Sequence, residues 1–411
     1  MNDNTALHAA LQAGQVQPVF IFDYNILKDL DQDDGRVSFI HTCLEALNAQ
    51  LKPLGTSIKT YYGDPMDVWT EIIATQKTGT VYFNRDYEPY ALSRDQALEK
   101  LFTKHEIGCL SFKDQVIFES DEVLKADGKP YTIYTPYKNK WLSQFEGVKG
   151  VNSEFLYSNF APSSYVIISL ESMGFIRSKK QVKPFSFSGL GSYHLVRDFP
   201  AEDRTSYLSP HLRFGTISVR ECVEQATHLN ETFLAELIWR EFFMQILVHY
   251  PYVTSACFRS KYDAIQWRND ESDFQAWCRG ETGYPFVDAG MRQLNTTGYM
   301  HNRVRMITAS FLVKHLLVDW RWGERYFANH LLDYDLSANN GNWQWAAGTG
   351  CDAAPYFRIF NPIEQLKKFD PDMSYAKRWI RDLSESSYPK PIVDHKFARE
   401  RCLSTYKAAL G

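Results

Sequence analysis

The chain of 411 residues is 44% hydrophobic and 23% charged, with a formal net charge of −4, which is typical of a globular protein with room for two or three domains. No apolar run approaches the roughly 18 residues of a membrane span and no secretion signal opens the sequence, so we expect a cytosolic protein. The seven cysteines form no CxxC pair and the histidines no HExxH motif, so no metal site and no disulfide scaffold are expected.

Strand-like and helix-like stretches alternate in the first part of the chain. The strand patterns are QPVFIFD (17–23), SIKTYYG (57–63), TVYFNRD (80–86) and IGCLSFKD (107–114), and helical patterns occupy 36–53 and 64–76. This alternation predicts a parallel, Rossmann-like α/β sheet with right-handed crossovers. The chain opens on a helix, with Asp3 as the predicted N-cap and Gly14 after the last turn. The strand that normally comes first in such a sheet is therefore missing.

The middle of the chain, residues 116–186, lacks a clear period and is rich in Pro, Tyr, Ser and Lys, which indicates a long connection between domains. Beyond residue 187 the pattern turns helical, with long amphipathic stretches such as ETFLAELIWREFFMQILVHYP. We therefore predict an α/β domain over 1–115, a connection over 116–186 and an all-α domain over 187–411.

The stretch ELIWREFF has an unusual helical face. Glu236, Trp239, Arg240 and Phe243 share it because they lie at i, i+3, i+4 and i+7. A carboxylate, an indole and a guanidinium together can form a functional surface or a solvated rim with a snorkelling Arg. Taken alone, this helix slightly favours the rim.

The helix that follows His301 shows a similar face. Asn302, Arg305, Met306 and Ala309 lie on one side of it. A mid-helix Asn on such a face usually has a partner, although a packing Met and a capping Asn are the alternative.

The stretch RTSYLSPHLRF places Thr205 and Ser206 at a predicted helix start, with Tyr193 and Arg197 upstream. Hydroxyls and free backbone N–H groups at a helix N-terminus suit a phosphate. Simple helix capping explains the same pattern equally well.

The stretch DYDLSANNGNWQWAAGTG (333–350) contains no Lys, Arg or Glu, but it holds Trp343 and Trp345 among Asn, Gly and Ala. An EF-hand loop would need Gly at its sixth position and Glu at its twelfth, where this chain has Ala338 and Gln344. The GTG at its end lacks the third glycine of a dinucleotide fingerprint. A calcium loop and a Rossmann NAD site are therefore both disfavoured.

Together with TGYPFVDAGMRQLNTTGYMHNRVRMITASFLVKHLL, DWRWGERYF and NNGNWQWAAGTGCDAAPYFRIFNP, these stretches resemble the flavin-binding domain of the photolyase/cryptochrome family. The resemblance is dense over 190–365 and extends more loosely to YPKPIVDHKFARE and to the N-terminal part. Within the family it is closest to the microbial class I cyclobutane pyrimidine dimer (CPD) photolyases. It implies an N-terminal α/β antenna domain and a C-terminal helical domain that binds one folded FAD.

The resemblance also implies which residues bind FAD. The amide of Asn339 would face the flavin N5, Asp333 and Asp335 would hold the ring edge and the ribose side, and Arg305 would pair with Asp333. The other positions implied to contact the cofactor are Tyr193, Arg197, Thr205, Ser206, Leu208, Ser209 and Asn302.

An electron-transfer chain is implied as well, running from Trp343 through Trp320 to Trp267 near the surface. Indoles suit this role because they pass through a radical state at an accessible potential.

For the substrate, the resemblance implies a cavity lined by Trp239 and Trp345 that takes a dimer flipped out of the duplex. Glu236, Asn302 and Met306 match positions that touch the dimer, and Arg303 and Arg358 match positions that grip the flanking phosphates.

The implied activity is that of a deoxyribodipyrimidine photo-lyase. Excited reduced FAD donates an electron to the dimer, the cyclobutane ring opens and the electron returns. We expect a monomer that acts on DNA containing pyrimidine dimers and not on membranes.

Three other functions compete with this one. A cryptochrome-type blue-light sensor without repair activity is the main alternative, and the joint presence of Glu236, Asn302, Met306 and Trp345 disfavours it. A photolyase for (6-4) lesions would carry a His pair where His301 is followed by Asn302. A DNA-binding module without catalysis would not need Asn339 or the Trp chain.

The sequence departs from the family at the antenna side. The family's first strand, with a WFRRDLR-like segment, has no counterpart before Met1; a misassigned start is the favoured explanation, and a damaged antenna domain is the other. Tyr87 and Glu88 fit the folate-antenna pattern, but Thr254 and Ser255 replace the usual Cys-Lys pair. This leaves open whether methenyltetrahydrofolate, or a deazaflavin or flavin, binds as a second chromophore.

Overall fold

The computed structural model describes residues 1, 3–148 and 156–411. These residues form two compact units. Unit 1 comprises Met1–Glu119, Phe145–Lys183 and Phe214–Gln225, and unit 2 comprises Ser120–Gln144, Pro184–Arg213 and Ala226–Gly411. The stretch 116–186 therefore contributes to both units, while the predicted domain limits themselves stay a prediction. None of the described helices is both long and apolar enough to cross a membrane.

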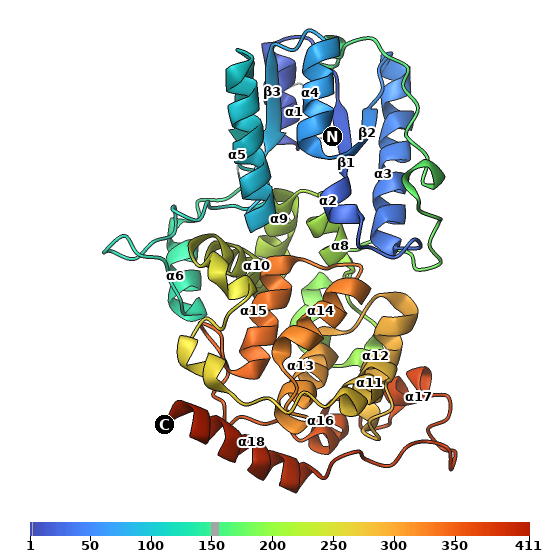
Figure 1. The fold of residues 1–411 in the computed structure, drawn as a ribbon, viewed down its shortest axis with the longest axis vertical. Coiled ribbons are helices and arrows are strands. Elements are labelled where there is room, and N and C mark those ends of the chain that lie inside the picture. The colour runs from blue at the N-terminus through green and yellow to red at the C-terminus, as the bar shows by residue number, and fades with distance from the viewer. Residues whose placement is uncertain (2, 149–155) are drawn as a thin grey trace. The chain divides into compact units, whose positions relative to one another are not determined.

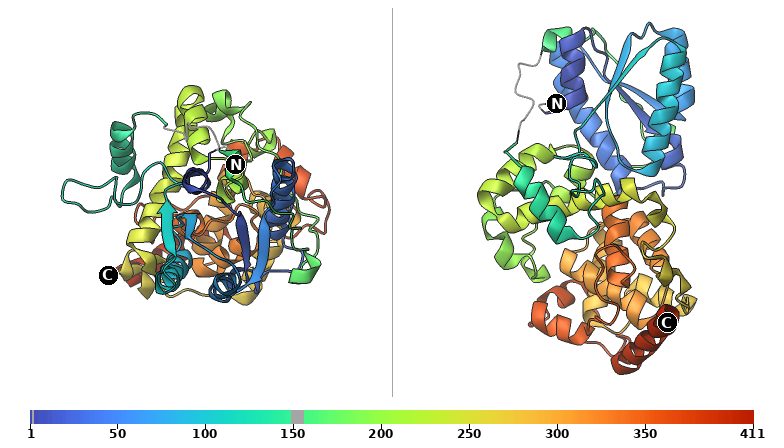
Figure 2. Two further views of the ribbon diagram at one scale, coloured as in Figure 1. Left: turned by 90° about the horizontal axis from the view of Figure 1, so that it is seen from above. Right: turned by 90° about the vertical axis from the view of Figure 1, so that its left-hand side faces the viewer.

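The described residues of unit 1 include four parallel strands that form two separate pairs (Figures 1 and 2). The strands are β1 Val19–Asp23, β2 Lys59–Gly63, β3 Thr80–Asn84 and β4 Gly108–Phe112. β1 pairs with β2, with Val19 opposite Lys59, and β3 pairs with β4, with Thr80 opposite Gly108. The predicted parallel α/β architecture is confirmed, but as two strand pairs without a shared strand between them.

Helices precede, connect and follow these strands along the chain. They are α1 Thr5–Ala13, α2 Tyr24–Leu27, α3 Gly35–Leu51, α4 Pro65–Thr75 and α5 Pro89–Lys104, and α9 Val219–Leu229 begins in this unit. Helix α1 packs against β3 and β4. Leu11, Phe22, Val37 and Phe160 are among the buried side chains of the main core of this unit.

The N-cap of the first helix differs from the prediction. Asn4 caps α1, since its side chain accepts a hydrogen bond from the Leu7 N–H. Asp3 lies one residue too early and instead pairs with Arg220, with 2.7 Å between Oδ2 and Nε. The prediction was wrong because Asp and Asn are nearly equivalent caps, and the distant Arg220 selects between them.

Unit 2 is helical around one large core, which contains Trp277, Phe286, Leu312, Trp320 and Trp343 among its buried side chains. Its helices are α6 Tyr134–Gln144, α7 Tyr193–Val196, α8 Leu208–Arg213, α10 Glu231–His249, α11 Glu271–Arg279, α12 Pro285–Thr297, α13 Asn302–Ser310, α14 Trp320–His330, α15 Leu336–Ala347, α16 Pro362–Phe369, α17 Ser374–Trp379 and α18 His395–Leu410. A π-helical turn, Phe311–His315, follows α13.

Helix α6 belongs to unit 2 because it docks on α10. The Trp141 indole donates a hydrogen bond of 2.6 Å to the buried carboxylate of Glu241, and the Tyr137 hydroxyl approaches the same oxygen at 3.4 Å. The hydrogen bonds that Glu241 accepts from these two side chains offset the desolvation cost of burying its carboxylate. The irregular composition of residues 120–144 concealed this helix in the sequence.

Candidate functional site in the helical unit

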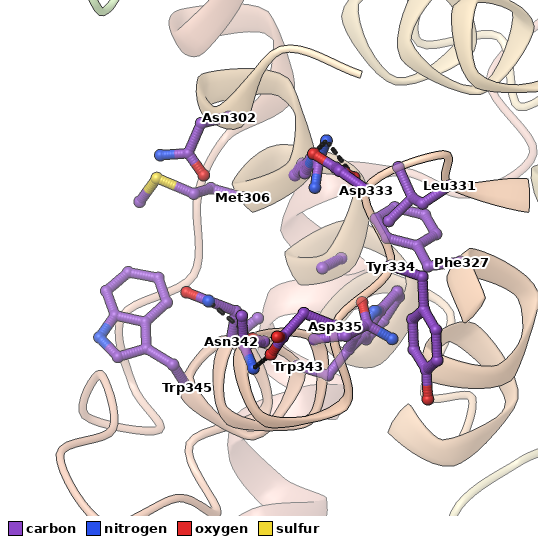
Figure 3. A pocket seen from close by; sticks show the side chains of 15 residues that line it. Asn302, Met306, Phe327, Leu331, Asp333, Tyr334, Asp335, Asn342, Trp343 and Trp345 are labelled. Carbon is purple, nitrogen blue, oxygen red and sulfur yellow. Dashed lines mark hydrogen bonds and ion pairs between the residues drawn. The ribbon is translucent and has the colours of Figure 1, made fainter. Parts of the chain in front are cut away.

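A cavity opens between α13, α14 and α15, and we call it the α13–α15 cavity (Figure 3). It holds about 590 Å³ of space free of protein atoms, including the part open to solvent. Its lining residues are Asn302, Arg305, Met306, Ala309, Phe327, Leu331, Asp333, Tyr334, Asp335, Ala338, Asn339, Asn342, Trp343, Trp345 and Ala346. Most of the flavin-ring residues and three of the lesion residues implied by the sequence therefore share one cavity.

Helix α15 carries much of this lining, and its sequence explains how. Asp335 caps the N-terminus by accepting the Ala338 N–H at 2.9 Å. The spacing of Asn339, Asn342 and Trp345 brings them to one face. Gly348 ends the helix with a φ of 85°, a left-handed conformation that favours glycine. The amides and indoles of this stretch are thus the inner wall of a cavity.

One corner of the cavity is a fixed carboxylate. Asp333 accepts hydrogen bonds from Arg305 Nη2 at 3.1 and 2.9 Å and from the Ser209 hydroxyl at 2.7 Å. Arg305 also donates from Nε to the Met300 carbonyl at 2.8 Å. Both ends of the ion pair are held, so the carboxylate presents a defined polar edge. The expected pairing of Arg305 with Asp333 is present in the structure.

Asp335 is buried at the start of α15 and still keeps its charge. Burial raises its pKa, but the nearby Arg213 and Arg240 and hydrogen bonds from Ser337 and the Ala338 N–H together hold the pKa below its ordinary value. A charged, immobile carboxylate beside the cavity is suited to accept hydrogen bonds from hydroxyl groups.

Asn339 has its amide orientation set by a neighbour. Its Nδ2 donates to Oε1 of Glu324 at 2.9 Å and to the Glu324 carbonyl at 3.0 Å. No described residue donates a hydrogen bond to its Oδ1, whereas its Nδ2 has two acceptors. Because both amide hydrogens are committed, Asn339 can offer only an acceptor to a molecule in the cavity.

Trp343 is buried, with 2% of its surface exposed, and its ring packs edge-on against Phe327 at 5.0 Å. It fits beside α14 because position 323 is glycine: a β-carbon there would lie 2.1 Å from the indole. Trp320 is buried in the same core. Trp267 is half-buried and packs against Tyr406 at 6.0 Å. Exposure therefore increases only at the residue expected to lie last in the Trp chain.

The cavity residues expected to touch the lesion stand apart from the carboxylate corner. In Figure 3, Asn302, Met306 and Trp345 lie at one side, and Asp333, Tyr334 and Leu331 at the other. Asn302 is the first residue of α13, capped by His301. The expectation of a mid-helix Asn was wrong, because the His301 side chain begins the helix just before it.

Glu236 and Arg197 are not among the lining residues of this cavity, and they pair with each other. Arg197 Nη1 lies 2.7 Å from Glu236 Oε1. Burial raises the pKa of Glu236 above its ordinary value, although Arg197 opposes the shift. The resemblance implied that Arg197 contacts the cofactor and Glu236 the dimer. In the structure the two side chains instead form an ion pair with each other. Tyr193 stacks its ring against Arg197, 5.3 Å from the guanidinium carbon.

Trp239 also lies outside the lining of the α13–α15 cavity. Its indole stacks on Tyr134 of α6, with ring centroids 3.6 Å apart and an interplanar angle of 9°. One face of Trp239 is therefore already covered by protein. The sequence could not show this, because Tyr134 comes from the irregular middle stretch.

The two arginines expected to grip phosphates differ in their surroundings. Arg303 donates to Asp198 at 2.7 Å and lies over the Phe369 ring at 4.3 Å. Arg358 is exposed, and its guanidinium carbon lies 5.6 Å from the Phe360 centroid. Arg358 can meet a phosphate as it stands, whereas Arg303 would first have to leave or share Asp198.

The residues expected at a phosphate-binding helix start are arranged differently. Helix α8 begins at Leu208, so Thr205 and Ser206 lie in the preceding loop, where the Ser206 carbonyl accepts the Ser186 N–H at 3.0 Å. Leu208 is buried. The predicted helix start was too early because Tyr207 adopts a φ of 53°, which interrupts a helix.

Some site residues were missed in the sequence. Glu324, Asn342, Tyr334 and Phe327 either line the cavity or orient its lining. Asn342 lies three residues after Asn339, so helical spacing alone could have found it. Glu324 carried no local signal, since its role depends on the approach of α14 to α15.

The cavity has the chemistry of a flavin site. It combines apolar and aromatic walls with a fixed carboxylate corner and an acceptor-only amide. A flat heteroaromatic ring system with N–H donors and polar edges matches this set of groups.

Comparison with known proteins agrees with this geometry. The family model described as the FAD binding domain of DNA photolyase matches residues 233–387, and the model described as DNA photolyase matches residues 1–155. The deoxyribodipyrimidine photo-lyase of Vibrio cholerae is 36% identical over 458 residues, which cover 100% of this chain and 97% of that protein.

Two solved structures are similar over nearly the whole chain. A class III photolyase from Agrobacterium tumefaciens has a TM-score of 0.88 at 36% identity, covering 99% of this chain and 95% of that one. An archaeal photolyase from Sulfolobus tokodaii, described with two FAD molecules, has a TM-score of 0.87 at 36% identity, covering 99% and 96%. The closer likeness to class I stays a prediction. The chain itself belongs to the DNA photolyase family, and its helical unit contains the FAD-binding domain of that family.

Proposed function

We propose that this protein reverses cyclobutane pyrimidine dimers in DNA by light-driven electron transfer, with the dimer flipped out of the duplex. The observation that supports this most directly is the α13–α15 cavity, where the expected flavin-ring residues and the lesion residues Asn302, Met306 and Trp345 line one space. A cofactor and a substrate that share a cavity can react at short range.

FAD fits the residues present. Asn339 can only accept at its Oδ1, which matches the N–H that a reduced flavin carries at N5. Asp333, fixed by Arg305 and Ser209, and the charged Asp335 would hold further polar groups. When bound, reduced FAD would supply the light-excited electron donor for dimer cleavage.

The protein's own contribution is position and exclusion of water. The edge of Trp345 and the thioether of Met306 would form an apolar wall for the pyrimidines, and the Asn302 amide would offer donors and an acceptor to their polar edges. Glu236 would donate a hydrogen bond to the pyrimidine C4 carbonyl, which requires its proton. Burial raises the pKa of Glu236, although the ion pair with Arg197 opposes this shift.

Trp343, Trp320 and Trp267 would return electrons to an oxidised cofactor. This proposal is supported by the burial of the first two in one core and by the partial exposure of the third. A half-exposed final indole can be reduced by a donor from solvent, whereas the buried ones cannot.

DNA binding would rest on phosphate contacts for affinity and on the cavity for lesion recognition. Arg358 is placed to make such a contact, and Arg303 would do so after exchange of its Asp198 partner.

The deciding experiment is dimer reversal in an ultraviolet-treated oligothymidylate, with a reductant, under blue light and in the dark. We expect the thymine absorbance to return only under light. Glu236→Ala should lose most of this activity while FAD, followed by its absorbance, stays bound. Glu231→Ala, a change at an exposed position of the same helix, should leave the activity unchanged.

Absence of reversal in a fully reduced, FAD-containing protein would contradict the proposal and favour a light sensor. Equal loss in both variants would show that Glu236→Ala acts through helix α10 and not through the substrate.

A further inference from the structure

A column of three aromatic rings joins helices α6, α10 and α15; we call Tyr134, Trp239 and Phe243 the aromatic column. The Tyr134 ring lies parallel to the Trp239 indole, with centroids 3.6 Å apart. Phe243, one turn further along α10, stacks on the same indole at 5.4 Å and 27°. The Phe243 ring packs on Gly341 of α15, where a β-carbon would lie 2.1 Å from it. The column therefore sets how closely α10 approaches the helix that lines the cavity.

Tyr134 is the most tightly fixed member of the column. Its side chain is buried, its hydroxyl donates to the Ala235 carbonyl in α10 at 2.6 Å, and its backbone N–H donates to the Asp352 carboxylate at 2.9 Å. Asp352 follows the end of α15, so Tyr134 connects α10 to the chain just beyond the cavity wall. Burial, with the nearby Glu236 adding to it, raises the pKa of Tyr134, so the hydroxyl keeps its proton and continues to donate.

Trp239 has little freedom left in this arrangement. Tyr134 covers one face, and Phe242 meets the indole edge-on at 5.5 Å. The indole is nevertheless half-buried and not fully enclosed. A base can reach only the part of the ring that the column leaves open, and that part is held in one orientation.

We propose that Tyr134 is a positioning residue for dimer recognition, which fixes the indole surface that Trp239 presents to a flipped-out pyrimidine. This inference rests on the proposed repair function and assigns a role to α6. Pre-orienting an aromatic side chain lowers the entropy lost when it stacks on a base. Without the Tyr134 ring, Trp239 could adopt other rotamers and would have to be ordered at each binding event.

The test compares Tyr134→Leu, which removes the stacking ring, with Tyr134→Phe, which keeps the ring and removes only the hydroxyl. The measured quantity is the discrimination of the FAD-containing protein between damaged and undamaged DNA. It is the dissociation constant for an undamaged oligonucleotide divided by that for an oligonucleotide with one cyclobutane dimer. We expect Tyr134→Leu to reduce this discrimination by about tenfold, in the range of the loss of one base–aromatic stack. Tyr134→Phe should retain most of it.

Tyr137→Leu is the matched control. Tyr137 is a buried tyrosine on the same helix that packs on Phe242 and has no ring contact with Trp239 among the described pairs. Both leucine variants should unfold at lower temperature, but only Tyr134→Leu should lose discrimination. Equal losses in the two variants would overturn the proposal, since α6 would then act only as a structural support.

A double-mutant cycle separates the positioning role of Tyr134 from the proposed role of Trp239 in lesion binding. If Tyr134 acts through Trp239, then Tyr134→Leu should add little to the loss caused by Trp239→Leu. Additive effects would contradict the positioning role. If Trp239→Leu itself left discrimination unchanged, the assignment of Trp239 to the lesion would fail, whatever the result at Tyr134.

Discussion

Gly323 in α14 shows how one residue can control the inner wall of the site. A β-carbon there would lie 2.1 Å from Trp343 and 2.6 Å from Leu312, far inside van der Waals contact. Alanine is the better helix former by about 1 kcal/mol, but overpacking of a core costs about 1–3 kcal/mol. Because the clash involves a buried indole without room to move, the cost of overpacking should exceed the gain in helix propensity.

We therefore expect Gly323→Ala to lower the free energy of unfolding by up to about 2 kcal/mol, the difference between these two effects. Chemical denaturation followed by circular dichroism would measure it. Gly189→Ala is the control, because nothing lies within 4 Å of a β-carbon at that position. A stabilised Gly323→Ala protein would show that Trp343 can shift without cost.

We expect Lys314 to make the stability of the protein depend on pH. It is 1% exposed, and its Nζ donates to the Ala347 carbonyl at 2.7 Å. Burial lowers the pKa of Lys314 from its usual 10.5 to about 7. Between these two values the unfolded chain holds a proton on Lys314 that the folded chain has lost. Since the unfolded state binds more protons there, stability should rise with pH.

The measurement is the free energy of unfolding at pH 7 and at pH 9, in the protein and in Lys314→Met. We expect the rise with pH to be smaller in Lys314→Met, because methionine cannot titrate. Lys396→Met, at an exposed position of α18, should keep the full rise. If Lys314→Met kept it too, another buried group would have to be responsible.

Helix α15 is held at both ends, and this fixes the residues that it carries. Asp335 caps its N-terminus. At its C-terminus the Ala347 carbonyl accepts from Lys314 at 2.7 Å and from the Tyr406 hydroxyl of α18 at 2.8 Å. Orphan carbonyls at a helix end need such donors when they are buried. The C-terminal helix thus supports the cavity wall without lining it.

From this we expect Tyr406→Phe to cost about 1 kcal/mol of stability, the usual net value of one hydrogen bond. Lys314 would still satisfy the Ala347 carbonyl, which keeps the loss moderate. Thermal unfolding would report it, with Tyr262→Phe as a control on a neighbouring ring 6.3 Å away. An equal effect of both changes would contradict the role of the Tyr406 hydroxyl.

The strand pairs of unit 1 illustrate a different principle at the level of elements. An isolated pair of strands is marginal in water, so β1–β2 and β3–β4 depend on the helices packed on them. Helix α1 packs against β3 and β4 and leads through the chain into β1. Local alternation predicted each strand and helix, but it could not show whether the strands would form one sheet or two.

At the scale of the whole molecule, charge limits how DNA can bind. The net charge is −4, with 45 basic and 49 acidic side chains, so attraction to DNA must come from individual cations placed at the interface and not from the net charge. Each phosphate contact that is neutralised contributes about one unit to the slope of log affinity against log salt concentration.

Arg358 and Arg303 should differ in this measurement. We expect Arg358→Ala to reduce the salt slope by about one unit, because the exposed guanidinium is free to replace a counterion. Arg303→Ala should reduce it less, since Arg303 is already neutralised by Asp198. Fluorescence anisotropy with dimer-containing DNA over a range of salt concentrations would test this. A larger change for Arg303→Ala would show that Asp198 releases it on binding.

Much of the architecture was predictable from the sequence, because it depends on local periods. The short runs of β-branched and aromatic residues VFIF and TVYF predicted strands, and the period of 3.6 in ELIWREFF and RVRMITA predicted helices with one polar face. Resemblance to a known family then identified the cavity residues Asn339, Arg305 and Asp333, and the structure brings them together. Helix starts were less predictable, because caps such as Asn4 and His301 compete with neighbours of similar propensity.

Only the tertiary structure decided which polar and aromatic side chains, far apart in the sequence, contact one another. Arg197 pairs with Glu236, Glu324 turns the Asn339 amide, and Tyr134 covers Trp239. The sequence by itself determined which side chains each element presents, since that follows from backbone geometry within a few residues. Which of them meet depends on how separate helices pack, and a shift of a few ångströms between helices, too small to alter any local pattern, would exchange one partner for another.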